Sequence, residues 1–143
     1  MTMIIPSDAA ISKLLKDVHV FAIVGASAKV ERPSFKVMSF LLSKGYHVIP
    51  VNPMMTDGDI LGQKVYRALS EVPAPVDVVD FFRSSEAVLE DVRAAIKEKD
   101  RLGIKCIWMQ LGVFNETAAF EAAEAGAMVV MDRCPKIEWS RLF

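Results

Sequence analysis

The sequence predicts an α/β fold in which five parallel strands form one sheet with helices on both faces. Two observations support this prediction. Five short runs are apolar almost throughout, and segments with the helical spacing of apolar residues lie between them. Strands that are apolar on both sides are typical of a parallel sheet whose two faces are covered. Strand–helix repetition with short connections then indicates right-handed crossovers and a doubly wound sheet.

The predicted strands are the five apolar runs, which are rich in β-branched residues. They are Val18–Val24, His47–Val51, Val76–Phe82, Ile104–Met109 and Ala127–Met131. The first run stops at Gly25, where we expect the chain to turn toward its first helix.

The predicted helices occupy the intervals between the strands and both ends of the chain. Proline is favoured at a first helical position, serine and asparagine cap a helix start, and glycine commonly follows a helix end. On these signals the helices run from Pro33 to Gly45, from Ser84 or Ser85 to Gly103 and from Asn115 to Gly126, with short ones at Ser7–Lys16 and from Pro135 onward.

The second crossover, from Met54 to Pro75, has no helical pattern. It contains Asp57-Gly58-Asp59, one candidate for a short strand at Gln63–Tyr66, and several prolines. We expect a loop that lies over the carboxyl edge of the sheet.

Length and composition bound the class of protein. The 143 residues predict a single domain over 1–143, and 52% hydrophobic with 24% charged residues excludes a disordered chain. The net charge of -1 lacks the basic excess of a duplex-binding protein, so we expect no nucleic-acid partner. Two cysteines exclude a disulfide framework. With no signal peptide and no apolar run of membrane-spanning length, we expect a cytoplasmic protein without a membrane partner.

The first strand-to-helix turn is the candidate binding site. In an open α/β sheet, ligands bind outside the carboxyl ends of the strands at the point where the strand order reverses. The first strand ends in Val24-Gly-Ala-Ser27, and the amides at the next helix start attract phosphate. Lys29, Arg32 and Lys36 can add positive charge. The alternative is that these residues only close a turn.

The glycine fingerprint of a dinucleotide site is absent. Gly-x-Gly-x-x-Gly would place glycines where this chain has Ser27 and Val30, and the acidic residue expected after the second strand is replaced by Asn52. The sequence therefore argues against NAD and leaves room for another nucleotide that carries phosphates.

Several short motifs, in order, resemble those of one family. They are Val24-Gly-Ala-Ser27, Glu31-Arg-Pro-Ser34, Val48-Ile-Pro-Val-Asn-Pro53, Ile60-Leu-Gly62, Val76-Asp-Val-Val-Asp80, Trp108-Met-Gln-Leu-Gly112 and Met131-Asp-Arg-Cys-Pro-Lys136. Together they are similar to the stand-alone CoA-binding proteins of the Rossmann-like CoA-binding superfamily, and to the N-terminal domain of the succinyl-CoA synthetase alpha subunit. The resemblance covers about Val18 to Leu142 and implies a three-layer Rossmann-like sandwich.

The resemblance also implies which residues contact coenzyme A (CoA) or an acyl-CoA. They are Gly25, Ala26 and Ser27 in the first turn, Asn52 and Pro53 after the second strand, Phe82 and Arg83 after the third, and Gln110 and Gly112 after the fourth. For the cations that meet the phosphates we choose Arg32 and Arg83, since arginine binds phosphate in a bidentate fork.

Structural alternatives remain for three of these residues. Phe82 is next to Phe81, and one of the two is expected in the core because consecutive strand residues face opposite ways. Arg83 can pair with Glu86, and Gln110 can satisfy backbone groups.

Residues for catalysis are scarce, so we expect no enzyme. His19 and His47 lie in predicted strands, and there is no phosphate loop, His-Glu-x-x-His pair or Gly-x-Ser-x-Gly elbow. Asp77, Asp80 and Asp132 lie near strands, where salt bridges or caps explain them. We expect no metal site.

Cys134 is the one candidate for reactive chemistry. It precedes Pro135 at a predicted helix start and follows Arg133, and both features favour a thiolate. Because it follows the fifth strand, its thiol could contact that of CoA. The alternative is that Cys134 is a half-buried structural cysteine. Cys106 lies in the middle of a predicted strand, and we expect its thiol to be inert.

The sequence therefore predicts a protein that binds CoA or an acyl-CoA without turnover. Its candidate partners are further copies of itself, in a homo-oligomer, or an acyl-CoA enzyme. Two alternatives use the same site. One is an NADP-type oxidoreductase, with Arg32 on the 2′-phosphate. The other is a nucleotide-responsive interaction module, with the segment from Met54 to Pro75 as its moving part.

Overall fold

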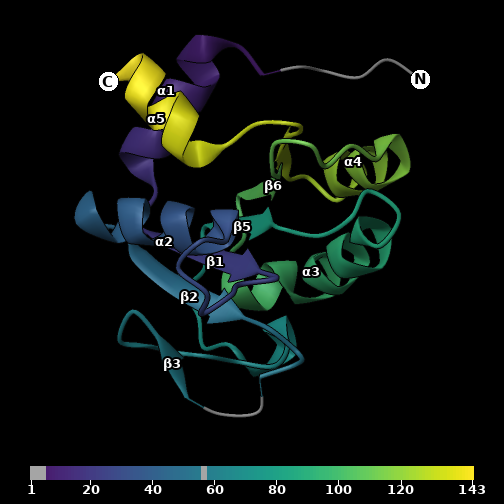
Figure 1. The fold of residues 1–143 in the computed structure, drawn as a ribbon. Coiled ribbons are helices and arrows are strands. Elements are labelled where there is room, and N and C mark those ends of the chain that lie inside the picture. Colours follow the sequence, from purple (N-terminus) through teal and green to yellow (C-terminus); the bar gives the residue numbers. More distant parts are fainter. Residues whose placement is uncertain (1–5, 56–57) are drawn as a thin grey trace.

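The computed structural model describes residues 6–55 and 58–143 and contains a five-stranded parallel sheet (Figure 1). Its strand order is β2-β1-β5-β6-β7, and every neighbouring pair is parallel. The strands are β1 Val20–Val24, β2 His47–Val51, β5 Val78–Phe81, β6 Cys106–Met109 and β7 Met128–Val130. The predicted doubly wound, Rossmann-like fold is confirmed, and its strand order reverses between β1 and β5.

Helices cover both faces of the sheet and give three layers (Figure 1). One face carries α1 Asp8–Asp17, α2 Pro33–Ser43 and α5 Pro135–Leu142, and the other carries α3 Val88–Leu102 and α4 Glu116–Glu124. Each face has its own apolar cluster, because side chains of a strand alternate between the two faces. This buries both sides of the three central strands β1, β5 and β6.

Most of the expected helix ends are present. Ser7 caps α1, Asn115 accepts a hydrogen bond from the amide of Ala118 at 2.9 Å at the start of α4, and Gly103 ends α3 in the left-handed conformation. The predicted start at Ser84 or Ser85 is wrong by one turn. The Ser84 hydroxyl accepts from the Ala87 amide at 3.1 Å, which closes a separate turn before α3 begins.

The second crossover differs from the loop expected over the carboxyl edge. It forms an antiparallel hairpin, β3 Asp59–Ile60 with β4 Gln63–Lys64, followed by the short 3₁₀ helix η1 Leu69–Glu71. The Tyr66 amide donates to the carbonyl of Pro50 at 3.0 Å, so this segment continues the sheet beyond the outer edge of β2. Asp57, which the sequence singled out, lies outside the described residues.

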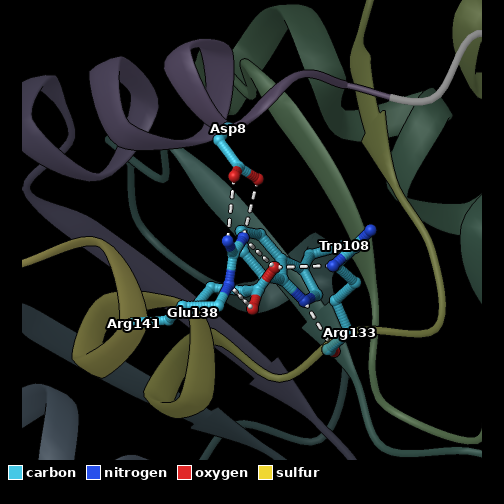
Figure 2. Close-up of polar contacts among 5 residues, drawn as sticks. All are labelled: Asp8, Trp108, Arg133, Glu138 and Arg141. Carbon is cyan, nitrogen blue, oxygen red and sulfur yellow. Dashed lines mark hydrogen bonds and ion pairs between the residues drawn. The ribbon is translucent and has the colours of Figure 1, made fainter.

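An ion-pair network joins the first and last helices to the sheet (Figure 2). The guanidinium of Arg141 on α5 donates to both carboxylate oxygens of Asp8 on α1, at 2.9 and 2.7 Å. The buried Glu138 accepts from Arg133 at 3.0 Å and from Arg141 at 3.1 Å, and Trp108 Nε1 of β6 donates to the Arg133 carbonyl at 2.9 Å. We call these five residues the terminal-helix network.

None of the helices in the described part of the chain is both long and apolar enough to span a bilayer.

Candidate functional site

A pocket of about 1100 Å³ opens at the carboxyl ends of β1, β5 and β6, where the strand order reverses. The turns after β1, β2, β5 and β6 form its wall, together with the start of α2. This is the position that sheet topology favours for a ligand site. Its volume slightly exceeds the usual range of about 300–1,000 Å³ for small-molecule sites.

The structure brings together nine of the ten residues that the sequence predicted to contact the ligand. They are Gly25, Ala26, Ser27, Arg32, Asn52, Phe82, Arg83, Gln110 and Gly112. Pro53 is exposed and is not among the lining residues, although its neighbours Asn52 and Met54 are. Lys29 also lines the pocket, whereas Lys36 faces a separate groove on the outer side of α2.

The turn after β1 crosses the end of β5 at very close range. The Gly25 amide donates to the carbonyl of Val51 at 2.9 Å, and its φ of +89° is one that side-chain-bearing residues rarely adopt. A Cβ atom here would lie 2.3 Å from the carbonyl oxygen of Phe82. Asn52 then fixes the turn, since its Nδ2 donates to the Ala26 carbonyl at 2.7 Å. Asn52 therefore shapes the pocket as well as lining it.

The start of α2 gives the pocket a positive rim. Pro33 is the first helical residue, and Arg32 at the cap position makes no side-chain cap hydrogen bond. The amide of Ser27 donates to the hydroxyl of the buried Ser34 at 3.1 Å, which anchors the turn to the helix. Among residues 6–55 and 58–143, Lys29 and Arg32 form no ion pair with a carboxylate. Both cations are thus available to an anionic ligand.

Arg83 differs from these two cations because it is already paired. Its Nε lies 2.6 Å from a carboxylate oxygen of Asp91 on α3, so its partner is Asp91 and not Glu86, which the sequence offered as an alternative. The remaining guanidinium nitrogens can still donate to a phosphate. Phe82, half-buried, forms an apolar wall beside it, while Phe81 is the core residue of the two.

Gln110 has a side-chain partner rather than the backbone partner considered from the sequence. With its amide oriented to suit its neighbours, Nε2 donates to both carboxyl oxygens of Asp80, at 3.2 and 3.1 Å. Asp80 is fully buried on β5, and this burial raises the pKa of its carboxyl well above the usual value. The expected salt bridge or cap is therefore wrong for Asp80. The sequence did contain a signal that Asp80 differs from a structural aspartate, because it lies inside an otherwise apolar strand.

The other two strand-flanking aspartates do have structural partners. Asp77 accepts from the amides of His19 and Val20 at 2.8 and 3.0 Å and lies 3.6 Å from Lys105. Asp132, which has a φ of +59°, accepts from the Gly112 amide at 2.7 Å. This last bond ties the rim turn after β6 to the turn after β7.

Cys134 is not among the residues that line the pocket, although the sequence argument placed its thiol near that of CoA. Cys134 does precede α5 as expected, but its side chain is 7% exposed and belongs to the apolar cluster under α1, α2 and α5. Because α5 folds back over this face, its cap residue is covered. Cys106 is also buried, which raises the pKa of its thiol.

Several lining residues were missed by the sequence argument. Ser34, Met54, Ser84, Ala87, Leu111 and Val113 reach the pocket from the rims of the turns. Leu111 and Met54 are exposed, so the pocket mouth is partly apolar. Ser34 and Leu111 lie within motifs quoted above, but no contact was assigned to them. The other four lie outside those motifs, and all six are within a few residues of a strand end or a helix start.

Comparison with known proteins gives matches that cover nearly the whole chain. Residues 19–140 match the family model described as a CoA binding domain. The uncharacterized protein YneT of Bacillus subtilis (strain 168) is 37% identical over 132 residues, which are 92% of this chain and 93% of that protein.

Solved structures show the same architecture. A hypothetical protein from Pyrococcus horikoshii OT3 is 37% identical, with a TM-score of 0.87 over 99% of both chains. A dinucleotide-forming acetyl-coenzyme A synthetase of Ca. Korarchaeum cryptofilum, solved with phosphate and ADP, is 27% identical with a TM-score of 0.69. It matches 84% of this chain and 27% of its own, so the similarity there is to one part of a larger enzyme.

Proposed function

From the premise that this chain belongs to the CoA-binding domain family, we propose that it binds CoA or an acyl-CoA at the carboxyl-edge pocket, without turnover of its own. The observation that carries the proposal is a tight backbone turn beside two cations that form no ion pair with any described residue. The turn at Gly25–Ser27 faces the same space as Lys29 and Arg32, at the point where the strand order reverses.

The chemistry of this rim suits the phosphates of CoA. A diphosphate and a 3′-phosphate need several donors, and guanidinium groups and helix-start amides supply short, charge-assisted hydrogen bonds. Arg83, whose side chain lies beside the Gly25 turn, adds donors, although Asp91 offsets part of its charge. The apolar mouth at Met54 and Leu111 suits the pantetheine arm.

The absence of turnover is inferred from where the reactive side chains lie. His19 precedes β1 and His47 begins β2, so both are at the amino edge of the sheet, opposite the pocket. Both cysteine thiols are buried in the core. The side chains at the pocket wall are therefore suited to holding a ligand rather than to transferring a group.

A thermal-shift comparison tests the proposal. CoA, NADP and ATP are added to the protein at equal concentration, and CoA is expected to raise the melting temperature most. A ligand at a hundredfold excess over its dissociation constant stabilises a protein by about 2.7 kcal/mol, which such a scan detects. An equal or larger shift with NADP would overturn the assignment.

A further inference from the structure

The carboxyl of Asp80 lies in the centre of the sheet, where carboxyl groups are costly to bury. Asp80 is 0% exposed on β5, flanked in the sheet by Ile23 of β1 and Trp108 of β6. Within the described part of the chain no lysine, arginine or histidine forms an ion pair with it. An unpaired buried carboxyl costs free energy, so a fold without a use for it would be expected to carry an apolar residue.

Asp77, just before β5, shows which contacts an aspartate with a structural role makes in this protein. Its carboxylate accepts from the amides of His19 and Val20 and lies near Lys105. These contacts satisfy the first amides of β1. Asp80 has none of them, and its hydrogen-bond partner is the side chain of Gln110.

Gln110 connects the buried carboxyl to the pocket. It follows β6, is 6% exposed, and lines the pocket wall. When the Asp80 carboxyl is ionised, both of its oxygens accept from Nε2, and the amide atom left for the pocket is Oε1, which can only accept a hydrogen bond. Without Asp80, the amide could rotate and present either atom.

We propose that Asp80 is a positioning residue: it holds Nε2 of Gln110 and thereby presents Oε1 to the pocket as an acceptor for an N–H group of the ligand. This inference rests on the proposed function. CoA carries such donors in the exocyclic amine of adenine and in the amides of its pantetheine arm. Phosphate groups, the alternative occupants of this end of the pocket, would be repelled by Oε1, because phosphate oxygens are also acceptors.

Titration calorimetry with CoA on four proteins tests the assignment. Asp80→Asn keeps the shape but adds an N–H group that competes for Oε1, and Gln110→Met keeps the length but removes the acceptor. Each is expected to weaken CoA binding about tenfold, the effect of losing roughly one hydrogen bond. The double variant is also expected to lose about tenfold, because Asp80 acts through Gln110.

Asp77→Asn is the matched control. It changes the neighbouring buried aspartate of the same segment and is expected to leave CoA affinity as in the wild type. If Asp80→Asn does not fold, Asp80→Ser removes both carboxyl oxygens and takes its place in the same cycle.

Adenosine 3′,5′-bisphosphate, which lacks the pantetheine arm, locates the donor. If Asp80→Asn weakens this ligand as much as CoA, the donor is the adenine amine; if it weakens only CoA, the donor is a pantetheine amide. Two results would overturn the positioning role but leave the proposed function in place. One is wild-type affinity of Asp80→Asn for CoA, and the other is a double variant whose loss of affinity is the product of the two single losses. Failure of the wild type to bind CoA would overturn the proposed function and this role with it.

Discussion

Arginine serves different purposes in the terminal-helix network and at the pocket rim. In the network, Arg141 meets both Asp8 and Glu138, and Arg133 meets Glu138. At the rim, Arg32 forms no ion pair within the described residues. The same side chain is thus balanced by carboxylates where it holds helices together and left unbalanced where a ligand can bind. The pairing of a cation, rather than its presence, separates the two roles.

Arg83 lies between these two cases. It lines the pocket, yet its Nε is held by Asp91 at 2.6 Å. A paired guanidinium keeps a fixed direction, and its other nitrogens remain able to donate. We therefore expect charge removal to affect stability in the network, ligand affinity at Arg32, and both to a smaller extent at Arg83.

The largest effect is expected at the turn beneath the rim. Gly25→Ala places a methyl group 2.3 Å from the Phe82 carbonyl oxygen at a φ of +89°, so overlap and backbone strain act together. We expect a loss of about 3–4 kcal/mol in the free energy of unfolding, measured by urea denaturation.

Gly45→Ala is the control for strain alone. Its φ is +92°, but no heavy atom lies within 4 Å of the added Cβ. We expect a loss of about 1–2 kcal/mol. Equal losses in the two variants would show that the turn can relax away from β5.

The next largest effect is expected in the network. Glu138→Gln removes the buried charge that Arg133 and Arg141 share, while both arginines remain partly exposed and able to meet water. We expect about 2–3 kcal/mol of destabilisation by urea unfolding, with CoA affinity unchanged. A change in CoA affinity comparable to the change in stability would contradict the separation of the two regions.

Arg32→Ala should show the reverse pattern. Loss of a charged hydrogen bond to phosphate is expected to weaken CoA binding by about 1.5–2 kcal/mol in titration calorimetry, with the unfolding midpoint of the free protein nearly unchanged. Lys44→Ala serves as the control. Lys44 caps the opposite end of α2, away from the pocket, and this variant should bind CoA as the wild type does. If Arg32→Ala binds CoA normally, the phosphates lie elsewhere.

The sheet could be predicted from the sequence because its strands are apolar on both faces, as Val20–Val24 and Val78–Phe81 show apart from Asp80. The hairpin at Asp59–Lys64 could be predicted only in part: β4 Gln63–Lys64 lies within the candidate strand Gln63–Tyr66, whereas β3 Asp59–Ile60 was not identified. Its strands are two residues each and are stabilised by backbone pairing beside β2, as in the Tyr66–Pro50 hydrogen bond, which leaves no periodic pattern.

The site divides in the same way. Residues next to strand ends, such as Gly25 and Gln110, could be identified because parallel strands bring their carboxyl ends to one edge. Pairings between side chains could not, since Asp80–Gln110 depends on the register of β5 with β6. Burial of Cys134 depends on how α5 folds back, which its own sequence neighbours do not encode.

The smallest effect is expected at the exposed end of the network, where it depends on pH. The hydrogen bond from Arg141 lowers the pKa of Asp8 below its ordinary value, which is about 3.9 in an unfolded chain. A carboxylate with a lowered pKa stabilises the fold above that value and loses this contribution as pH falls through the folded pKa. Asp8→Asn should therefore be slightly less stable than the wild type at pH 7 and equally stable at about pH 2. Because the pair is exposed, 1 M salt should also reduce the difference at pH 7. Urea unfolding of both proteins at the two pH values measures it, and a difference that persists at low pH would mean that Asp8 acts through packing rather than charge.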